Sequence, residues 1–154
     1  MNEKLFAFLE KKRQYQSWQS WNLSDYGILN QLKRSSIKNI YLENFYFSNL
    51  DAFLALPEIE ELTLVNYYEL NINNVVKFQR LKRLIVHKKN LLNLSSIGQL
   101  KDLQYLDITK SNILDYAQLY SLIKLKTLKI DNPGVYELIL LKIFLKETNI
   151  IVSK

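Results

Sequence analysis

The chain has 154 residues, of which 48% are hydrophobic and 23% are charged, a length and composition that predict one folded domain. It carries 21 Lys and Arg against 15 Asp and Glu, for a net charge of +6, and it has no cysteine, which excludes disulfides and thiolate metal sites. The N-terminus does not resemble a secretory signal, and no run of about 18 apolar residues predicts a membrane span. We therefore expect a single cytoplasmic domain without a membrane contact.

Residues 1–36 precede the regular part of the chain. Four apolar side chains within residues 3–13 are spaced as on one face of a helix, with charged residues around them, which predicts an amphipathic helix. Such a helix lies either on a membrane surface or over the exposed end of a core, and we favour a cap. Residues 22–32 match residues 112–122 at several positions, so we expect a partial repeat after the cap.

From residue 37 onward, one spacing of aliphatic residues recurs every 22 residues. The spacing is apolar-x-x-apolar-x-apolar, and Leu, Ile or Val occupies all of its positions. These positions are Ile37, Ile40, Leu42; Ile59, Leu62, Leu64; Leu81, Leu84, Val86; Leu103, Leu106, Ile108; Leu125, Leu128 and Ile130. Three further apolar columns follow in each copy, beginning at Leu50, Phe53 and Leu56. This pattern predicts one short strand per repeat and a core built by stacking successive repeats.

The L-x-x-L-x-L spacing at 22-residue intervals resembles the leucine-rich-repeat family, specifically its 22-residue bacterial form. The resemblance implies an α/β solenoid: a right-handed coil with a parallel sheet on the concave face, helical or 3-10 segments on the convex face, and an N-terminal helical cap. We expect one leucine-rich-repeat domain over 1–154, with the cap and partial repeat in 1–36, five repeats in 37–146 and a terminal strand in 147–154.

The chain departs from the family pattern in the turn after each strand. The family places an asparagine three residues after the last strand leucine, where its amide bonds neighbouring turns. Here that column reads Phe45, Tyr67, Lys89, Ser111 and Pro133. The backbone groups of these turns must therefore find other partners.

Alternate side chains of each predicted strand point away from the core and form an exposed sheet face. This face mixes aromatic, aliphatic and charged residues, which is more typical of an interface than of a solvated surface. The resemblance also implies ligand binding on this face. The expected partner-binding residues are Tyr41, Glu43, Glu61, Thr63, Val65, Arg83, Ile85, His87, Tyr105, Asp107, Lys129 and Asp131.

Charged residues are segregated along the chain. No Lys or Arg lies between Lys38 and Lys77, where six acidic residues fall, and no acidic residue lies from Lys77 to Lys101. We expect an acidic band beside a basic band, which suits the steering of a protein partner. The basic band also permits a nucleic-acid-associated or scaffold role, but the acidic band and the lack of a nucleic-acid-binding motif disfavour it.

Nothing in the sequence predicts catalysis, a cofactor or a metal site. His87 is the only histidine, and its neighbours in the predicted register, Val65 and Thr109, offer no carboxylate to orient it. The terminal strand, with Ile150 and Val152 on its inward side, leaves an edge that a partner strand or a second copy can pair with. A frayed or lysine-protected edge is the alternative.

We therefore predict a non-enzymatic protein-binding module that acts through the concave face. Short cytosolic bacterial proteins of this type resemble immunity or antitoxin proteins. The resemblance implies neutralisation of a cognate toxin by occlusion, an inference by analogy of fold.

Overall fold

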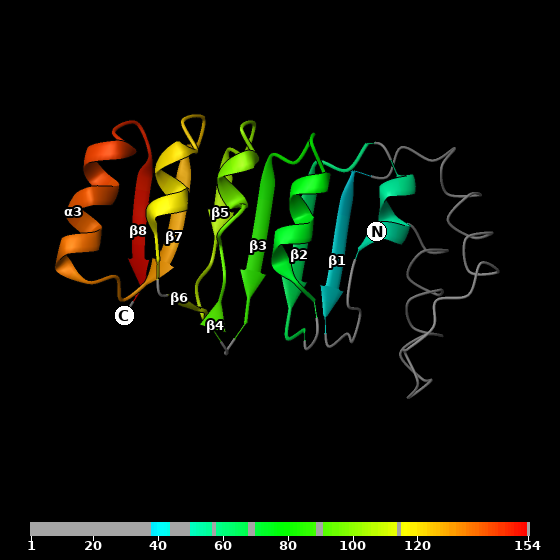
Figure 1. Ribbon diagram of the computed structural model, residues 1–154, viewed down its shortest axis with the longest axis horizontal. Coiled ribbons are helices and arrows are strands. Elements are labelled where there is room, and N and C mark those ends of the chain that lie inside the picture. Colours follow the sequence, from blue (N-terminus) through cyan, green and yellow to red (C-terminus); the bar gives the residue numbers. More distant parts are fainter. Residues whose placement is uncertain are drawn as a thin grey trace.

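The computed structural model describes residues 38–43, 50–56, 58–67, 70–88, 91–113 and 115–153. The expected N-terminal cap, the partial repeat and Ile37 lie outside these residues. In the described part, successive turns of the chain stack side by side in one direction, from β1 to β8 (Figure 1). Each turn contributes a strand to one layer and a short helix to the other, as the repeat pattern predicts.

The strands of the main sheet are parallel and follow chain order. They are β1 (Asn39–Glu43), β2 (Glu61–Val65), β3 (Arg83–His87), β5 (Tyr105–Asp107), β7 (Thr127–Asp131) and β8 (Asn149–Ser153). Each strand pairs with the next at an offset of 22 residues, so that Leu62 lies beside Leu84 and Leu84 beside Leu106. The predicted register is confirmed: one interval of the sequence repeat makes one turn of the coil. A second, two-stranded sheet joins β4 (Leu91–Leu92) to β6 (Asn112–Ile113).

Within the described residues, four short 3-10 helices cover the other side of the core, as expected (Figure 1). They are η2 (Asp51–Ala55), η3 (Ile72–Lys77), η4 (Ile97–Gln99) and η5 (Ala117–Ser121). The apolar columns explain this choice, because their members are three residues apart and a 3-10 helix has three residues per turn. Leu50, Phe53 and Leu56 consequently point to one side and are all buried.

The core runs between the two layers as a continuous stack of aliphatic side chains. Every described residue of the predicted strand columns is buried, from Ile40 to Ile130. Burying one such side chain contributes about 1.5–3 kcal/mol, so the stacking of turns on one another dominates the stability of the fold. Among the described residues, none forms a helix with the length and hydropathy needed to cross a membrane.

In one turn, a serine side chain forms the hydrogen bonds to a neighbouring turn that the family's asparagine would form. Ser111 Oγ donates a hydrogen bond to the carbonyl of Val86 and accepts one from the amide of Lys88, each at 3.1 Å. The side chain therefore joins two successive turns. At the ends of β2 and β7, Asn66 and Asn132 have φ of 50° and 37°, in the left-handed region that asparagine tolerates better than most residues.

The C-terminal turn differs from the earlier ones, because it contains an α-helix, α3 (Val135–Phe144), in place of a 3-10 helix. The sequence pattern predicts Phe144 inside the core, and this prediction is wrong: the residue is 54% exposed. An α-helix has 3.6 residues per turn, so a column spaced by three drifts around the helix. Leu141 and Leu145, four residues apart, are the buried pair instead, and Phe144 stacks on Tyr120 with ring centroids 4.6 Å apart.

Candidate protein-binding face

The outward side chains of the main sheet form three rows that run across the strands. The first row contains Glu61, Arg83, Tyr105 and Thr127; the second Tyr41, Thr63, Ile85, Asp107 and Lys129; the third Glu43, Val65, His87, Thr109 and Asp131. The structure thus brings all twelve predicted residues onto one face. Glu43, Glu61 and Tyr41 are exposed, Asp107 is buried, and the others are half-buried because neighbouring strands crowd them.

Two cations flank one aromatic ring at the centre of this face. The guanidinium carbon of Arg83 lies 3.6 Å from the centroid of the Tyr105 ring, and Lys129 Nζ lies 5.7 Å from it. Arg83 also approaches Glu61, with 4.0 Å between Nε and Oε2. The Tyr105 hydroxyl donates to Asp107 Oδ2 at 3.4 Å, so the ring leans along β5 toward this carboxylate.

Asp107 is the buried acid of the face, with 8% of its surface exposed. Its Oδ1 accepts hydrogen bonds from the hydroxyl of Thr109 at 2.7 Å, from the amide of Thr109 at 3.2 Å and from His87 Nε2 at 3.2 Å. Burial by itself raises the pKa of a carboxyl, but these donors favour the charged form more strongly, and the pKa of Asp107 lies below its usual value. Asp107 is therefore a charged side chain that is largely buried among its neighbours on the sheet face.

The contact between His87 and Asp107 contradicts the expectation that no carboxylate orients this histidine. Asp107 lies on the neighbouring strand one row away, a diagonal position that the in-row neighbours Val65 and Thr109 do not reveal. His87 and Asp107 are 20 residues apart in the sequence, two fewer than the repeat, so a search for partners at that spacing would have identified the contact. Thr109 Oγ1 lies 3.2 Å from the same His87 nitrogen.

The His87, Asp107 and Thr109 group does not have the geometry of a catalytic relay. In a relay the carboxylate and the hydroxyl contact opposite nitrogens of the imidazole. Here both contact Nε2, and the Thr109 hydroxyl is donated to Asp107. Among the described residues, no cluster of three or more His, Cys, Asp and Glu side chains is arranged to hold a metal ion. The contacts within this group hold its three side chains against one another on the sheet face.

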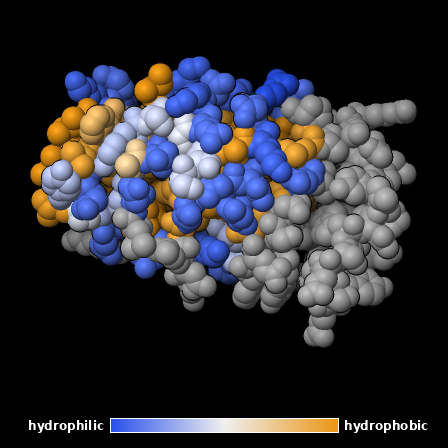
Figure 2. Space-filling view, viewed as in Figure 1, coloured by the Kyte–Doolittle hydropathy of each residue, from blue (hydrophilic) through white to orange (hydrophobic). Residues whose placement is uncertain are grey.

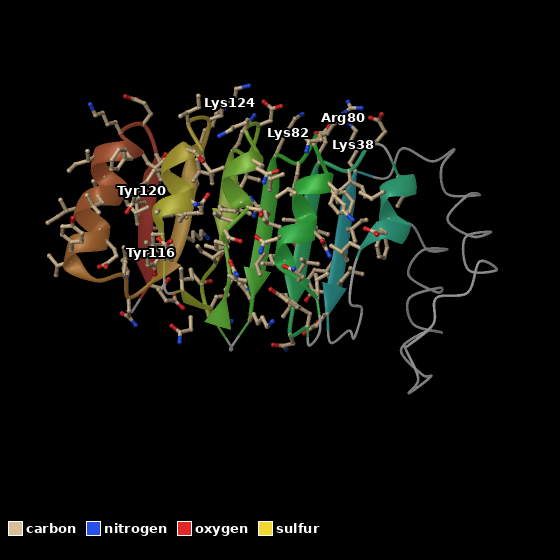
Figure 3. The ribbon with its side chains drawn as sticks, in the orientation of Figure 1. Lys38, Arg80, Lys82, Tyr116, Tyr120 and Lys124 are labelled. Atoms are coloured by element: carbon tan, nitrogen blue, oxygen red, sulfur yellow. The ribbon has the colours of Figure 1, made fainter. Side chains whose placement is uncertain are left out.

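The predicted acidic and basic bands neutralise each other across one repeat, which corrects the expectation of two free bands. Arg80 pairs with Glu58 at 2.7 Å and Lys82 with Glu60 at 2.9 Å, each 22 residues apart. Lys77 pairs with Asp51 at 2.7 Å, and Lys124 repeats the arrangement with Asp102 at 2.6 Å. Residues one repeat apart are spatial neighbours, so adjacent blocks of opposite charge become ion pairs. The cations Lys38, Arg80, Lys82 and Lys124 line the edge where the strands begin (Figure 3).

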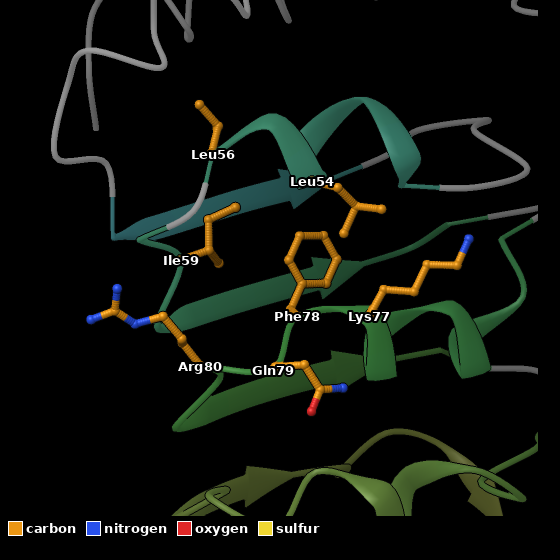
Figure 4. Close-up of a pocket in the computed structure, with 7 residues that line it drawn as sticks. All are labelled: Leu54, Leu56, Ile59, Lys77, Phe78, Gln79 and Arg80. Atoms are coloured by element: carbon orange, nitrogen blue, oxygen red, sulfur yellow. The ribbon is translucent and has the colours of Figure 1, made fainter.

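A cavity of about 180 Å³ opens on the helical side, between η2 and the segment after η3. Phe78 lies between Leu54 and Ile59 within it (Figure 4). The two charged residues at its rim, Lys77 and Arg80, are both ion-paired to acids of the preceding turn. The cavity therefore presents an apolar hollow with no converging polar groups, and it does not have the chemistry of an active site.

The geometry defines a solenoid with a parallel sheet on one face, and comparisons with solved structures agree. The chain is similar to a leucine-rich-repeat protein of Leptospira interrogans, with 27% identity and a TM-score of 0.62 over 80% of this chain and 32% of that one. Two proteins of Listeria monocytogenes share the fold. Internalin C2 has 22% identity and a TM-score of 0.58 over 82% of this chain and 58% of its own. Internalin F has 16% identity and a TM-score of 0.58 over 97% of this chain and 42% of its own.

The chain has the leucine-rich-repeat fold, on the combined support of its repeat, its register and these similarities. No protein-family model matches the sequence, and no curated protein matches it. The chain spans between 32% and 58% of the length of the three solved structures. The architecture is that of a protein-interaction module, because stacked repeats create an extended surface for binding.

Proposed function

We propose that the chain binds another protein through its concave face, without catalysing a reaction. The observation that supports this proposal is the centre of the face, where aliphatic and aromatic residues lie among charged groups that are only half-buried. Such a mixture, with an arginine and a tyrosine in stacking contact, is typical of the core of an interface. The twelve predicted residues that lie in these rows are the proposed contact residues.

A double substitution on the face tests this function. Tyr41→Ala with Ile85→Asp removes an exposed aromatic ring and places a charge at the centre of the sheet. We expect it to abolish capture of a partner that co-purifies with the wild-type chain. The control is Ile123→Asp, which introduces the same charge at a residue that is 78% exposed and lies outside the three rows. Equal capture by both folded variants would contradict the proposal.

We further propose that the partner is a bacterial toxin and that the chain is a cytoplasmic immunity or antitoxin protein. The support is the resemblance to short bacterial leucine-rich-repeat proteins of that role, which is an analogy of fold. Because the acids at positions 51, 58 and 60 are ion-paired to the next turn, docking through the acidic band is less favoured than docking through the sheet face. Co-expression with the product of the adjacent gene tests this role. A toxin that remains fully active in the complex contradicts it.

The edge of β8 is a second proposed contact surface, for a second copy of the chain. β8 is hydrogen-bonded to β7 on one side, and Ile151 and Val152 are 38% and 41% exposed. Antiparallel pairing about Ile151 sets Ile150 opposite Val152, so the strand is self-complementary. Exposed apolar residues of α3 extend this end of the molecule, where Figure 2 shows hydrophobic residues gathered.

Sedimentation of the 154-residue chain tests this contact. We expect a concentration-dependent dimer that Ile151→Lys dissociates, because a lysine on an edge strand opposes pairing. A wild-type chain that remains a monomer contradicts the pairing.

A further inference from the structure

Two cations at the centre of the concave face contact the same aromatic ring. Arg83 and Lys129 come from β3 and β7, two strands apart, and both approach the ring of Tyr105 on the intervening β5. The electron-rich face of a tyrosine ring attracts cations, so the Tyr105 ring favours the presence of both cations beside it. The hydroxyl of Tyr105 also donates a long hydrogen bond, 3.4 Å, to Asp107 Oδ2.

Asp107 lies in register with Lys129 on the neighbouring strand, but within the described residues its ion pair is with His87. Asp107 already accepts hydrogen bonds from Thr109, His87 and Tyr105, and it is nearly inaccessible. Among the described residues, the one ion pair of Glu61 is with Arg83, at 4.0 Å. Within the part of the chain that the structure describes, Lys129 forms no ion pair. Arg83 and Lys129 are thus the cationic groups that a partner meets at the centre of the face, and both are half-buried.

We propose that the partner places a carboxylate side chain against Arg83 and Lys129, beside the ring of Tyr105, and an apolar side chain against Ile85 and Val65. This inference rests on the proposed binding function and specifies its chemistry. A guanidinium and an ammonium that both approach one ring from neighbouring strands each offer charge-assisted hydrogen bonds to an oxyanion beside that ring. The half-buried Ile85 and Val65, in the adjacent rows, offer the apolar surface beside it.

The rest of the face favours an acidic segment of a protein over a nucleic acid. A nucleic acid brings a continuous row of phosphates, and on this face such a row meets Glu61 and Glu43, both exposed, on the N-terminal strands. A protein segment can place a single carboxylate at the cations and uncharged groups elsewhere. The cationic centre is limited to the span from β3 to β7, which suits one or two carboxylates.

Titration with short probe peptides tests the inference by solution NMR. The acidic probe is Gly-Leu-Glu-Leu-Glu-Gly, blocked at both ends; the basic probe has Lys in place of Glu; and the third probe is a six-nucleotide thymidine strand. We expect the acidic probe to shift the resonances of Arg83, Tyr105 and Lys129 at concentrations up to about 1 mM, with affinity that falls as salt screens the charges.

The decisive variants are Arg83→Gln with Lys129→Gln, and Lys129→Gln alone in case the double variant unfolds. We expect the double change to raise the Kd for the acidic probe about tenfold or more, the size associated with loss of charge-assisted hydrogen bonds. The matched control, Lys101→Gln with Lys126→Gln, removes the same charge from exposed residues outside the three rows and should leave the Kd unchanged.

Three results overturn the inference: no binding of the acidic probe, tighter binding of the basic or nucleotide probe, or equal losses in the double variant and its control. The variant Tyr41→Ala with Ile85→Asp distinguishes the proposed protein-binding function of the face from the proposed carboxylate site at Arg83 and Lys129. If it alone abolishes binding of the acidic probe, the face binds proteins but not through this carboxylate. If no variant changes binding, both the site and the proposed function fail.

Discussion

The central turns of the solenoid and its C-terminal turn carry apolar residues at the same repeat positions, but they bury them very differently. Val86 in β3 is fully buried, whereas Val152, three repeats later in β8, is 41% exposed. Leu122 at the end of η5 is fully buried, whereas Phe144, one repeat later, is 54% exposed. The repeat position thus determines which way a side chain points and not whether it is covered.

The difference shows that a turn of this fold is stabilised by its neighbours on both sides. Each repeat buries its apolar side against the next one, so a central turn has two contacting turns and β8 has one in the structure. Polar groups follow the same rule. Asp107 and Ser111, in a central turn, bond to residues of the preceding turn, whereas the described polar groups of α3 face solvent to a greater extent.

The largest expected effect is on the aliphatic stack of the central turns. Leu106 is fully buried between Leu84 and Leu128 on the two neighbouring strands. Leu106→Ala should lower the free energy of unfolding by about 2–5 kcal/mol, because it removes buried surface and leaves a cavity. Urea unfolding followed by circular dichroism measures the loss.

Val86→Ala and Val152→Ala form the matched pair for this comparison. The first should cost about 1.5–3 kcal/mol, since the side chain is fully buried. The second should cost about 0.5 kcal/mol or less, as expected for a side chain left largely in solvent. Equal costs would show that β8 is covered in solution, which is also the result expected if two copies pair through that edge.

The next effect concerns the buried charge of the central turn. The pKa of Asp107 is lower in the folded chain than its usual value, so its ionised form stabilises the fold above the unfolded-state pKa of about 3.9. That contribution is lost as the pH falls through the folded-state pKa. Asp107→Asn should therefore reduce stability at pH 7 by about 1.5–3 kcal/mol and flatten the acid side of the stability curve.

The control for Asp107 is Asp115→Asn, which removes the same charge from an exposed side chain. It should leave the acid side of the curve as steep as in the wild-type chain. Chemical denaturation between pH 2 and pH 7 distinguishes the two variants. A steep curve for Asp107→Asn would assign the acid sensitivity to other carboxylates.

A smaller loss is expected at the serine that joins two turns. Ser111→Ala removes the bonds to the Val86 carbonyl and the Lys88 amide, which should cost about 1–2 kcal/mol. Hydrogen exchange should also become faster at the Lys88 amide. Ser153→Ala, at an exposed position of β8, is the control and should change neither quantity. Unchanged exchange at Lys88 would mean that water replaces the serine at no cost.

The smallest effect is expected at the ion pairs along the edge where the strands begin. Arg80→Ala should cost less than about 1 kcal/mol, because Arg80 and Glu58 are both substantially exposed. A double-mutant cycle with Glu58→Ala measures the coupling, which should decrease as salt is added. A coupling that salt leaves unchanged would indicate that the pair is shielded from solvent.

The contacts that could be predicted from the sequence are those at the repeat distance. Leu62 beside Leu84 follows from the period alone, as does the arrangement of the twelve face residues in rows. The contacts that were missed join residues at other sequence separations: His87 and Asp107 are 20 residues apart, and Ser111 and Lys88 are 23 residues apart. They depend on which way a side chain leans across the sheet, and a periodic pattern carries no information on that lean.

By itself the sequence determined the period, the register and the sorting of strand residues between core and face, because alternation along a strand and stacking of equal repeats leave no other solution. The tertiary structure alone decided the contacts that lie off the repeat distance, such as His87 with Asp107 and Ser111 with Lys88, since these depend on how side chains lean across the sheet. It also decided the exposure of the last columns, because burial requires a neighbour and α3 turns by 3.6 residues where the earlier turns use three.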